Sequence, residues 1–312
     1  MILCTGTFGK GLAVDRSGQY DRPKMREYVW GTVGKVTGPI DSFVSPRARR
    51  LVSSARRVPS GYYAWAAIGI SLAVLLVNAM DFATVRQQWG EDYRFFMAIA
   101  DRWRTGASVY LPHQLAGPYA ELSGRDMIYP PVALLLFVPL SYLPAPLWWI
   151  IPLGTIAAVI VWFRPEAWTW PLLALALWYP RDESMIIWGN TGMWVAALVA
   201  LGLVWGWPAA LVLLKPSLAP FMLAGCRNPR ALALGVVVVA VVSLTMLPLW
   251  IDFVTAVQNA GATWPSVFYS LPDIPLLLMP LLAWAARSRR ERYQPLAAAE
   301  GFDRGRPELS MA

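Results

Sequence analysis

Long apolar runs recur along this chain, and the first of them, from Tyr62 to Met80, is close to the length of a bilayer crossing. Crossing a bilayer as a helix takes roughly 20 residues. Of the 312 residues, 57% are hydrophobic and 15% are charged, whereas soluble domains carry about 25% charged residues. Because a helix satisfies its own backbone in lipid, the pattern predicts an all-α, polytopic transmembrane helical bundle.

Basic residues flank the apolar region at both ends and account for much of the net charge of +8. They precede the first run at Arg47, Arg49, Arg50, Arg56 and Arg57, and follow the last at Arg287, Arg289, Arg290 and Arg292. Positive charge beside membrane spans marks the cytoplasmic side. We therefore expect a multi-pass plasma-membrane protein with both termini in the cytoplasm, and a lipid bilayer, not nucleic acid, as the partner of this charge.

The polarity of the chain divides it into three parts. Residues 1–60 lack apolar periodicity and are expected to be a disordered, basic cytoplasmic tail. Residues 61–286 form the predicted transmembrane domain, in which the polar stretch 81–128 is the first extracytoplasmic loop. Residues 287–312 are expected to be a cytoplasmic C-terminal tail.

Several apolar runs are short or interrupted. Residues 131–143 contain Pro139 and are too short for a comfortable crossing, which favours a re-entrant half-helix. Full crossings are expected at 146–163, 167–180, 189–205, 231–249 and 272–286, with an outer stretch at 181–188 and an outer loop at 250–271. The total is about seven or eight membrane segments, including broken or re-entrant helices.

The run 207–225 is broken at Lys215-Pro216. A straight crossing here would place Arg227 and Arg230 outside, against the rule that positive charge stays inside. A hairpin that dips to Lys215 and returns keeps both arginines in the cytoplasm. We therefore predict a hairpin.

The first outer loop contains GEDYRFFMAIADRW, which is expected to be a helix lying in the membrane interface. Helical spacing places Phe96, Ile99 and Trp103 on one face. Asp92 precedes Phe96 by four residues and falls on the same face, whereas Asp101 faces water. Asp92 has two interpretations: an acid that stabilises the helix N-terminus, or a general base at the boundary between water and lipid.

Two cysteines and one histidine, His113, leave little for disulfide or metal chemistry. The acid pair Glu91 and Asp92 offers a poor metal site. We expect no metal and no cofactor.

Several short motifs follow one another in a recognisable order. They are Asp92 with Phe96, then Ala100, Gly106, Val109 and Tyr110, then Tyr129-Pro130-Pro131, Gly189-Asn190 and Lys215-Pro216. In this order they resemble glycosyltransferase family 87, whose members are polyprenyl-phosphate-sugar-dependent enzymes of the multispanning GT-C fold. Asn190 stands where that family has glutamine.

The resemblance implies a membrane glycosyltransferase that inverts the anomeric centre. The donor would be a polyprenyl-phosphate-linked sugar, with mannose or arabinofuranose as the sugar. The acceptor would be a glycolipid or cell-envelope glycan on the extracytoplasmic face. Asp92 would be the general base, and Asp81 is the second choice.

Further roles follow from the same resemblance and from charge. Lys215 is an ionisable residue in an apolar stretch, which indicates function by default, although its amine could also reach the interface. The donor phosphate would bind Lys215, Arg94 and Arg104. Arg102 and Arg181 are the alternatives on the outer side. The sugar or acceptor would contact Tyr110, Tyr129 and Asn190.

Two other functions remain open on the sequence alone. A lipid flippase or transporter would share the broken helices and the buried charge. A non-catalytic membrane subunit would need neither the acid nor the lysine in a reaction.

Overall fold

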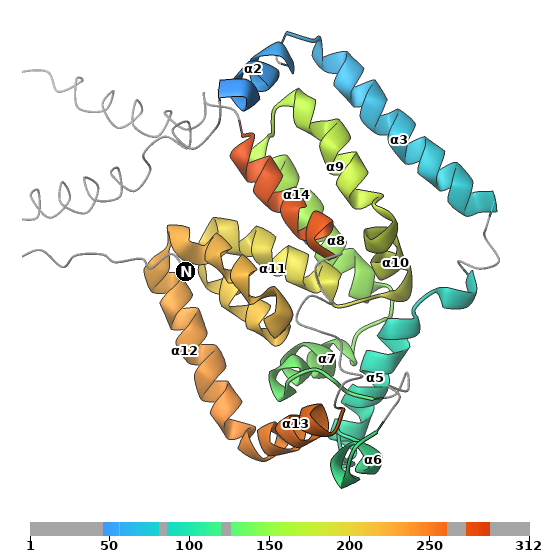
Figure 1. Cartoon of the computed structure of the whole chain (residues 1–312), viewed down its shortest axis with the longest axis vertical. Helices are drawn as coiled ribbons and strands as arrows, with labels where there is room; N and C mark the ends of the chain where they lie inside the picture. The colour runs from blue at the N-terminus through green and yellow to red at the C-terminus, as the bar shows by residue number, and fades with distance from the viewer. Residues whose placement is uncertain (1–45, 56, 81–85, 120–125, 261–272, 288–312) are drawn as a thin grey trace, which may run out of the picture. The chain divides into compact units, whose positions relative to one another are not determined.

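The computed structural model describes residues 46–55, 57–80, 86–119, 126–260 and 273–287. The chain divides into two compact units, Met1–Val58 and Pro59–Ala312. Within the described ranges the secondary structure is helical (Figure 1), apart from one isolated bridge between Pro165 and Arg287. The prediction of an all-α protein is confirmed for this part of the chain.

The first unit contains a helix where the sequence led us to expect a disordered tail. Helix α2 spans Pro46–Ala55. Proline is favoured at the first helical position, and arginine, alanine and leucine are good helix formers, so local preference explains this helix. The expected tail up to residue 60 is therefore too long, and its first 45 residues lie outside the described residues.

Helix α3 (Ser60–Met80) opens the second unit and matches the predicted first crossing. It buries none of its residues and packs along α9 (Trp170–Leu177), where the indole of Trp178 donates to the Ser71 hydroxyl over 3.0 Å. Leu72, Leu75 and Leu76 are exposed. A helix that is apolar on its exposed side suits lipid as its surroundings.

By length and apolar character, α3 is the one described helix that could cross a membrane unbroken, and the number rises to three if each of two bent helix pairs is a single span. The other apolar helices are shorter, each with 10–17 residues. The apolar helices indicate a membrane-embedded protein.

Helix α11 (Gly192–Trp205) lies at the centre of the second unit and is its most buried element. It packs against α8 (Leu147–Phe163) and α14 (Ile274–Ala285), and α14 also contacts α9, which follows the short η3 (Ala167–Thr169). Alanines and glycines on α11 let its neighbours approach closely, as is common between membrane helices. These helices occupy the crossings predicted at 146–163, 189–205 and 272–286.

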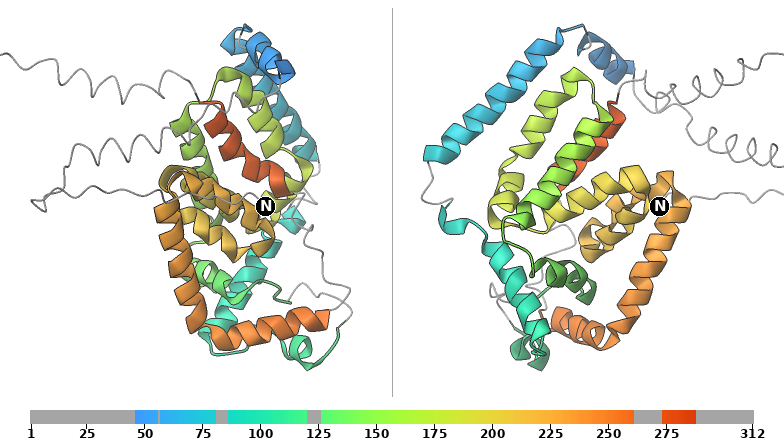
Figure 2. Two further views of the ribbon diagram at one scale, coloured as in Figure 1. Left: turned by 60° about the vertical axis from the view of Figure 1, so that its left-hand side comes forward. Right: turned by 180° about the vertical axis from the view of Figure 1, so that it is seen from behind.

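Two sharp bends depart from the expected pattern. Helix α10 (Pro180–Trp188), predicted as an outer stretch, meets α11 at 105° across Gly189, whose φ of 76° is left-handed. Helix α12 (Pro229–Thr245) meets α13 (Leu247–Ala260) at 86° (Figure 2). Proline cannot continue a helix interior without disruption, and Pro248 stands at this second bend. The expected outer loop at 250–271 is thus helical up to Ala260, and 261–272 lie outside the described residues.

The predicted break at Lys215 is confirmed. Two 3-10 helices, η4 (Trp207–Leu214) and η5 (Pro216–Arg227), lie side by side on either side of it. Their approach is close: a Cβ added at Gly225 would stand 2.5 Å from the Gly206 carbonyl oxygen and 2.9 Å from the Ala209 Cβ. The side-by-side packing is that of the expected hairpin.

The predicted interfacial helix is α5 (Glu91–Arg104), with Phe96 and Ile99 buried. It packs against α7 (Leu134–Leu140), which follows η2 (Pro131–Ala133) and matches the expected half-helix. Trp103, which was predicted on the same face, is 43% exposed. The apolar face of α5 therefore loses its protein cover before the helix ends.

The rest of the outer loop docks on α13. Helix α6 (Pro112–Ala116) contacts α13, and the Asn259 side-chain amide donates to the Gln114 carbonyl over 2.8 Å. The Tyr119 hydroxyl donates to the Ala256 carbonyl over 3.1 Å. The bend before α13 thus brings a late segment of the chain against an early one.

The close approach at Gly225 generates a stability prediction. Gly225→Ala should cost about 1–3 kcal/mol, because the added methyl group meets backbone and forces the hairpin apart. Gly69→Ala on α3 is the matched control: nothing lies within 4 Å of its added Cβ, so stability should stay the same or rise. Thermal unfolding of both variants in detergent measures this, and equal unfolding temperatures would contradict the hairpin packing.

Candidate functional site

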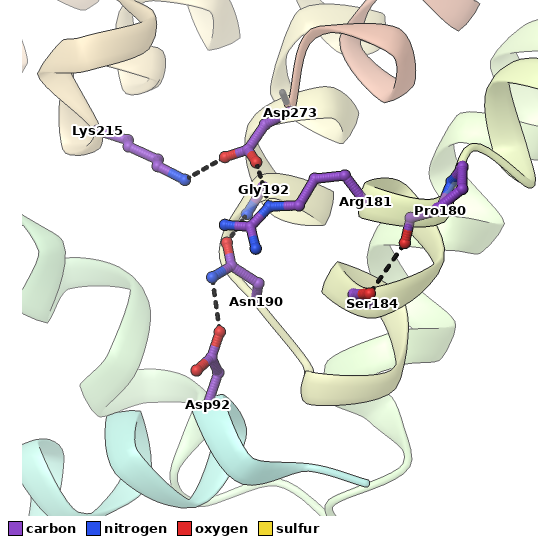
Figure 3. A network of polar contacts seen from close by, with 8 residues as sticks. All are labelled: Asp92, Pro180, Arg181, Ser184, Asn190, Gly192, Lys215 and Asp273. Atoms are coloured by element: carbon purple, nitrogen blue, oxygen red, sulfur yellow. Dashed lines mark hydrogen bonds and ion pairs between the residues drawn. The ribbon is translucent and has the colours of Figure 1, made fainter. Parts of the chain in front are cut away.

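Several interruptions of the helices meet at one place (Figure 3). Asp92 comes from the first turn of α5, Arg181 from that of α10, and Asn190 from the bend between α10 and α11. Lys215 lies at the break of the hairpin, and Asp273 precedes α14. Polar side chains can gather in an apolar bundle at such interruptions because the local backbone also needs polar partners.

Asn190 fixes the position of the Asp92 carboxylate. Its Nδ2 donates to Asp92 Oδ2 over 2.6 Å, and its Oδ1 accepts from the Gly192 backbone amide over 2.9 Å. The second bond determines which end of the amide faces the acid, because Oδ1 is already committed to a donor. Asp92 therefore has a defined orientation and is more than a solvated acid at a helix N-terminus.

The surroundings of Asp92 make it a better proton acceptor near neutral pH. Burial raises the pKa of its carboxyl above the ordinary value, and this effect outweighs the lowering by the Asn190 hydrogen bond and by the positive charges of Lys215 and Arg181. A general base is most effective when its pKa approaches the working pH. The carboxylate is thus suited to take a proton from a bound hydroxyl.

Two cations share the carboxylate of Asp273. Lys215 Nζ lies 3.0 Å from Asp273 Oδ2, and Arg181 Nε lies 3.4 Å from Asp273 Oδ1. Lys215 and Asp273 are only 4% and 1% exposed. A buried charge needs an opposite charge close by, so this bridge explains how a lysine is kept in the apolar interior.

Asp182 is a second buried acid beside this bridge. It is fully buried on α10, next to Arg181 in the chain. Asp182 lies close enough to Asp273 for the two charges to interact, and it lies at the backbone amide of Leu276 in the first turn of α14. The N-terminus of α14 therefore faces acids from two elements.

A small, mainly apolar cavity adjoins Lys215. Tyr129 borders it, and the Tyr129 hydroxyl hydrogen-bonds the Thr191 hydroxyl over 3.0 Å. The cavity has room for about one water molecule. It is also lined by Ala133, Leu136, Phe137, Trp194, Val195, Leu198 and Leu214. Its walls suit an apolar group, and Lys215 contributes to its lining.

The structure separates some predicted site residues from this cluster. Arg94 Nη1 donates to the Trp89 carbonyl over 2.8 Å, and the Arg104 guanidinium lies over the Tyr142 ring, 4.4 Å from its centroid. Tyr110 is buried in the core, where its hydroxyl donates to the Tyr129 carbonyl over 2.8 Å. Asp81 lies outside the described residues. Tyr110 thus supports the cavity wall from behind.

Neither Asp273 nor Asp182 has a role predicted from the sequence. A signal for Asp273 did exist: it lies at the start of the last apolar run, 272–286, and a lysine in an apolar stretch requires an acid somewhere. Nothing in the sequence pairs Asp273 with Lys215, which is 58 positions away. Asp182 stood in a segment that was expected to be an exposed outer stretch.

Metal chemistry finds no support in the described residues. No group of three or more His, Cys, Asp or Glu side chains there is placed to hold an ion. His113 is engaged elsewhere: its Nε2 lies 2.8 Å from Asp126 Oδ1. The site's chemistry therefore rests on carboxylates, two cations and an amide.

The hydrogen bond from Asn190 generates a prediction about protonation. Asn190→Leu removes the donor but keeps the site apolar, so the pKa of Asp92 should rise further, because that bond favours the ionised form. Dicyclohexylcarbodiimide reacts with protonated carboxyls, and peptide mass spectrometry can follow its adduct on Asp92 against pH. The pH of half-labelling should move upward in the variant, with Asp101, exposed on the same helix, as the reactivity reference. An unchanged profile would contradict the role of Asn190.

Comparisons with protein families, with curated proteins and with solved structures find no match for this chain. The geometry of the cluster and the motif resemblance therefore carry the functional argument.

Proposed function

We propose that the protein is a membrane glycosyltransferase that moves a sugar from a polyprenyl-phosphate donor to a hydroxyl of a glycolipid or cell-envelope glycan. One observation carries the proposal: an oriented, half-buried carboxylate, Asp92, lies near the buried Lys215 and the partly exposed Arg181, beside an apolar cavity. A base, a phosphate-binding pair and an apolar wall are what this transfer needs.

The proposed step is a single displacement with inversion. The acceptor hydroxyl gives its proton to Asp92 while its oxygen attacks the anomeric carbon of the sugar. The bond between that carbon and the phosphate oxygen breaks, and the electron pair leaves on polyprenyl phosphate. Positive charge near the departing phosphate stabilises the transition state, a role that falls to Lys215 and Arg181.

The cluster changes the assignment of the phosphate site. Arg181 replaces Arg94 and Arg104 as the partner of Lys215, because it shares the Asp273 carboxylate with that lysine. The cavity holds about one water molecule, so the start of the donor's isoprenoid chain would have to part its walls at Leu136 and Leu198. Tyr129 and Asn190 keep their proposed places beside the sugar or acceptor.

The proposed topology has seven or eight membrane segments in a GT-C-like arrangement, with both termini cytoplasmic. Bent pairs and short helices account for the segments that are not full spans. The hairpin would enter from the cytoplasmic side and bring Lys215 towards the outer half of the bilayer. Asp92 would then meet it from the extracytoplasmic loop, where lipid-linked sugars would be used.

A second candidate function is proton-coupled transport or lipid flipping. The buried Lys215–Asp273 bridge and the buried Asp182 favour it, since ionisable groups inside membrane bundles mark ion and proton paths. In this alternative the cluster would titrate during transport and Asp92 would have no acceptor. Transfer chemistry is the property that separates the two.

The base assignment can be tested directly. Asp92→Asn should lower sugar transfer from radiolabelled polyprenyl-phosphate sugars by at least about 100-fold, because the amide cannot take the proton. Asp101→Asn, on the exposed side of the same helix, is the matched control and should transfer normally. Assays in membranes containing the purified protein measure both.

Other results would point elsewhere. Transfer that survives Asp92→Asn removes Asp92 as the base. No transfer by the wild-type protein from mannosyl or arabinofuranosyl donors favours the transporter or a non-catalytic subunit.

The topology gives a separate prediction. In a Cys4→Ser protein, Cys226, which is exposed on η5, should react with a membrane-impermeant maleimide only after cells are permeabilised. Asp101→Cys, in a chain that also carries Cys4→Ser and Cys226→Ser, should react in intact cells. Labelling of both from the same side would overturn the proposed hairpin.

A further inference from the structure

We propose that the Asp273 carboxylate occupies the phosphate site when no ligand is bound. As this internal occupant, Asp273 competes with bound phosphate for the two cations and promotes release of the phosphate product. The inference rests on the proposed function, because it takes the anion to be the phosphate of a lipid-linked donor. It adds a residue outside the recognised motifs and gives it a role in product release.

The Asp273 carboxylate takes the position between the two cations that a bound phosphate would take. Asp273 offers one oxygen to Lys215 at 3.0 Å and the other to Arg181 at 3.4 Å. A phosphate can replace a carboxylate between these cations, since both groups present several oxygens to N–H donors. The Arg181 side chain retains 28% exposure, so a ligand would approach the bridge from its Arg181 side.

A bound phosphate has to displace the Asp273 carboxylate from the two cations. Asp273 stands directly before α14 but does not cap that helix. An aspartate in this position would bond the amide of the second or third helical residue, but the second is Pro275, which has no N–H, and the Leu276 amide lies at Asp182. The helix start therefore gives the displaced carboxylate no alternative partner, and Asp273 keeps competing for the cations.

Charge then distinguishes donor from product. Lys215, Arg181 and Asp273 together carry one net positive charge, which matches the single negative charge of a phosphodiester donor. The product is a phosphate monoester, which carries about −1.5 to −2 at neutral pH. Asp92, whose charge also acts on Lys215 and Arg181, makes a second negative charge still less favourable. A displaced Asp273 carboxylate that stays nearby therefore weakens binding of the monoester product more than binding of the diester donor.

The test measures binding to the full-length protein in detergent. The probes are farnesyl phosphate as the monoester, methyl farnesyl phosphate as the diester, inorganic phosphate and uncharged farnesol. Asp273→Asn should raise the affinity for farnesyl phosphate roughly tenfold, because a negative charge near the ligand is removed. The affinity for the diester should rise roughly threefold or less, and the affinity for farnesol should not change. Glu183→Gln, on the same helix as Arg181 but outside the bridge, should leave all four unchanged.

The source of the phosphate is decided by the same measurements. A gain for farnesyl phosphate much larger than for inorganic phosphate supports a lipid-linked ligand. Equal gains support the internal occupant but assign the site to free phosphate. Unchanged or weaker monoester binding in a folded Asp273→Asn protein overturns the proposal.

Loss of stability in Asp273→Asn gives a second readout. If the substitution lowers the unfolding temperature, farnesyl phosphate should restore it towards the wild-type value, because the phosphate replaces the missing carboxylate. Failure to restore it shows a purely structural ion pair. Since binding needs no turnover, these results stand apart from the transfer assay: absent transfer with the expected binding changes rejects the glycosyltransferase alone.

Discussion

The contact between Lys215 and Asp273 is the constraint on which the second unit depends. Burying either charge alone would cost several kcal/mol, and removing one partner leaves the other uncompensated. To bring the two together, the hairpin has to break at Lys215 and α14 has to begin at Asp273. Arg181 adds a second cation only because α10 starts at the same level. One buried ion pair thus fixes the positions of three chain interruptions.

The bend between α10 and α11 links this pair to the acid on α5. Gly189 adopts a left-handed conformation that glycine tolerates well, and a side chain there would also meet the Trp149 ring at 2.9 Å. The next residue, Asn190, then reaches Asp92, while the Trp148 indole holds the Gly189 carbonyl over 2.7 Å. Trp148 and Trp149 therefore support the geometry of the site.

Features that depend on neighbouring residues along the chain could be predicted from the sequence. Helical spacing singled out Asp92, and the charge pattern predicted the hairpin at Lys215, because each argument used neighbours along the chain. Sequence reasoning could not find the Lys215–Asp273 pair, since hydropathy does not record which interrupted helices meet. It also took α13 for a loop, because aromatic and polar residues mixed at an outer position are typical of both loops and surface helices. Arg94 and Arg104, predicted to bind the donor phosphate, lie near Asp92 in sequence but make other contacts, to the Trp89 carbonyl and the Tyr142 ring.

The docking of the outer loop on α13 has a mechanical consequence. Tyr110 contacts Phe253 of α13, with ring centroids 6.2 Å apart, and its hydroxyl holds the backbone of Tyr129. Tyr129 in turn borders the cavity and reaches Thr191 at the start of α11. A displacement of α13 is therefore transmitted through two tyrosines to the cavity wall. The width of that cavity depends on a surface helix to which the sequence assigned no structure.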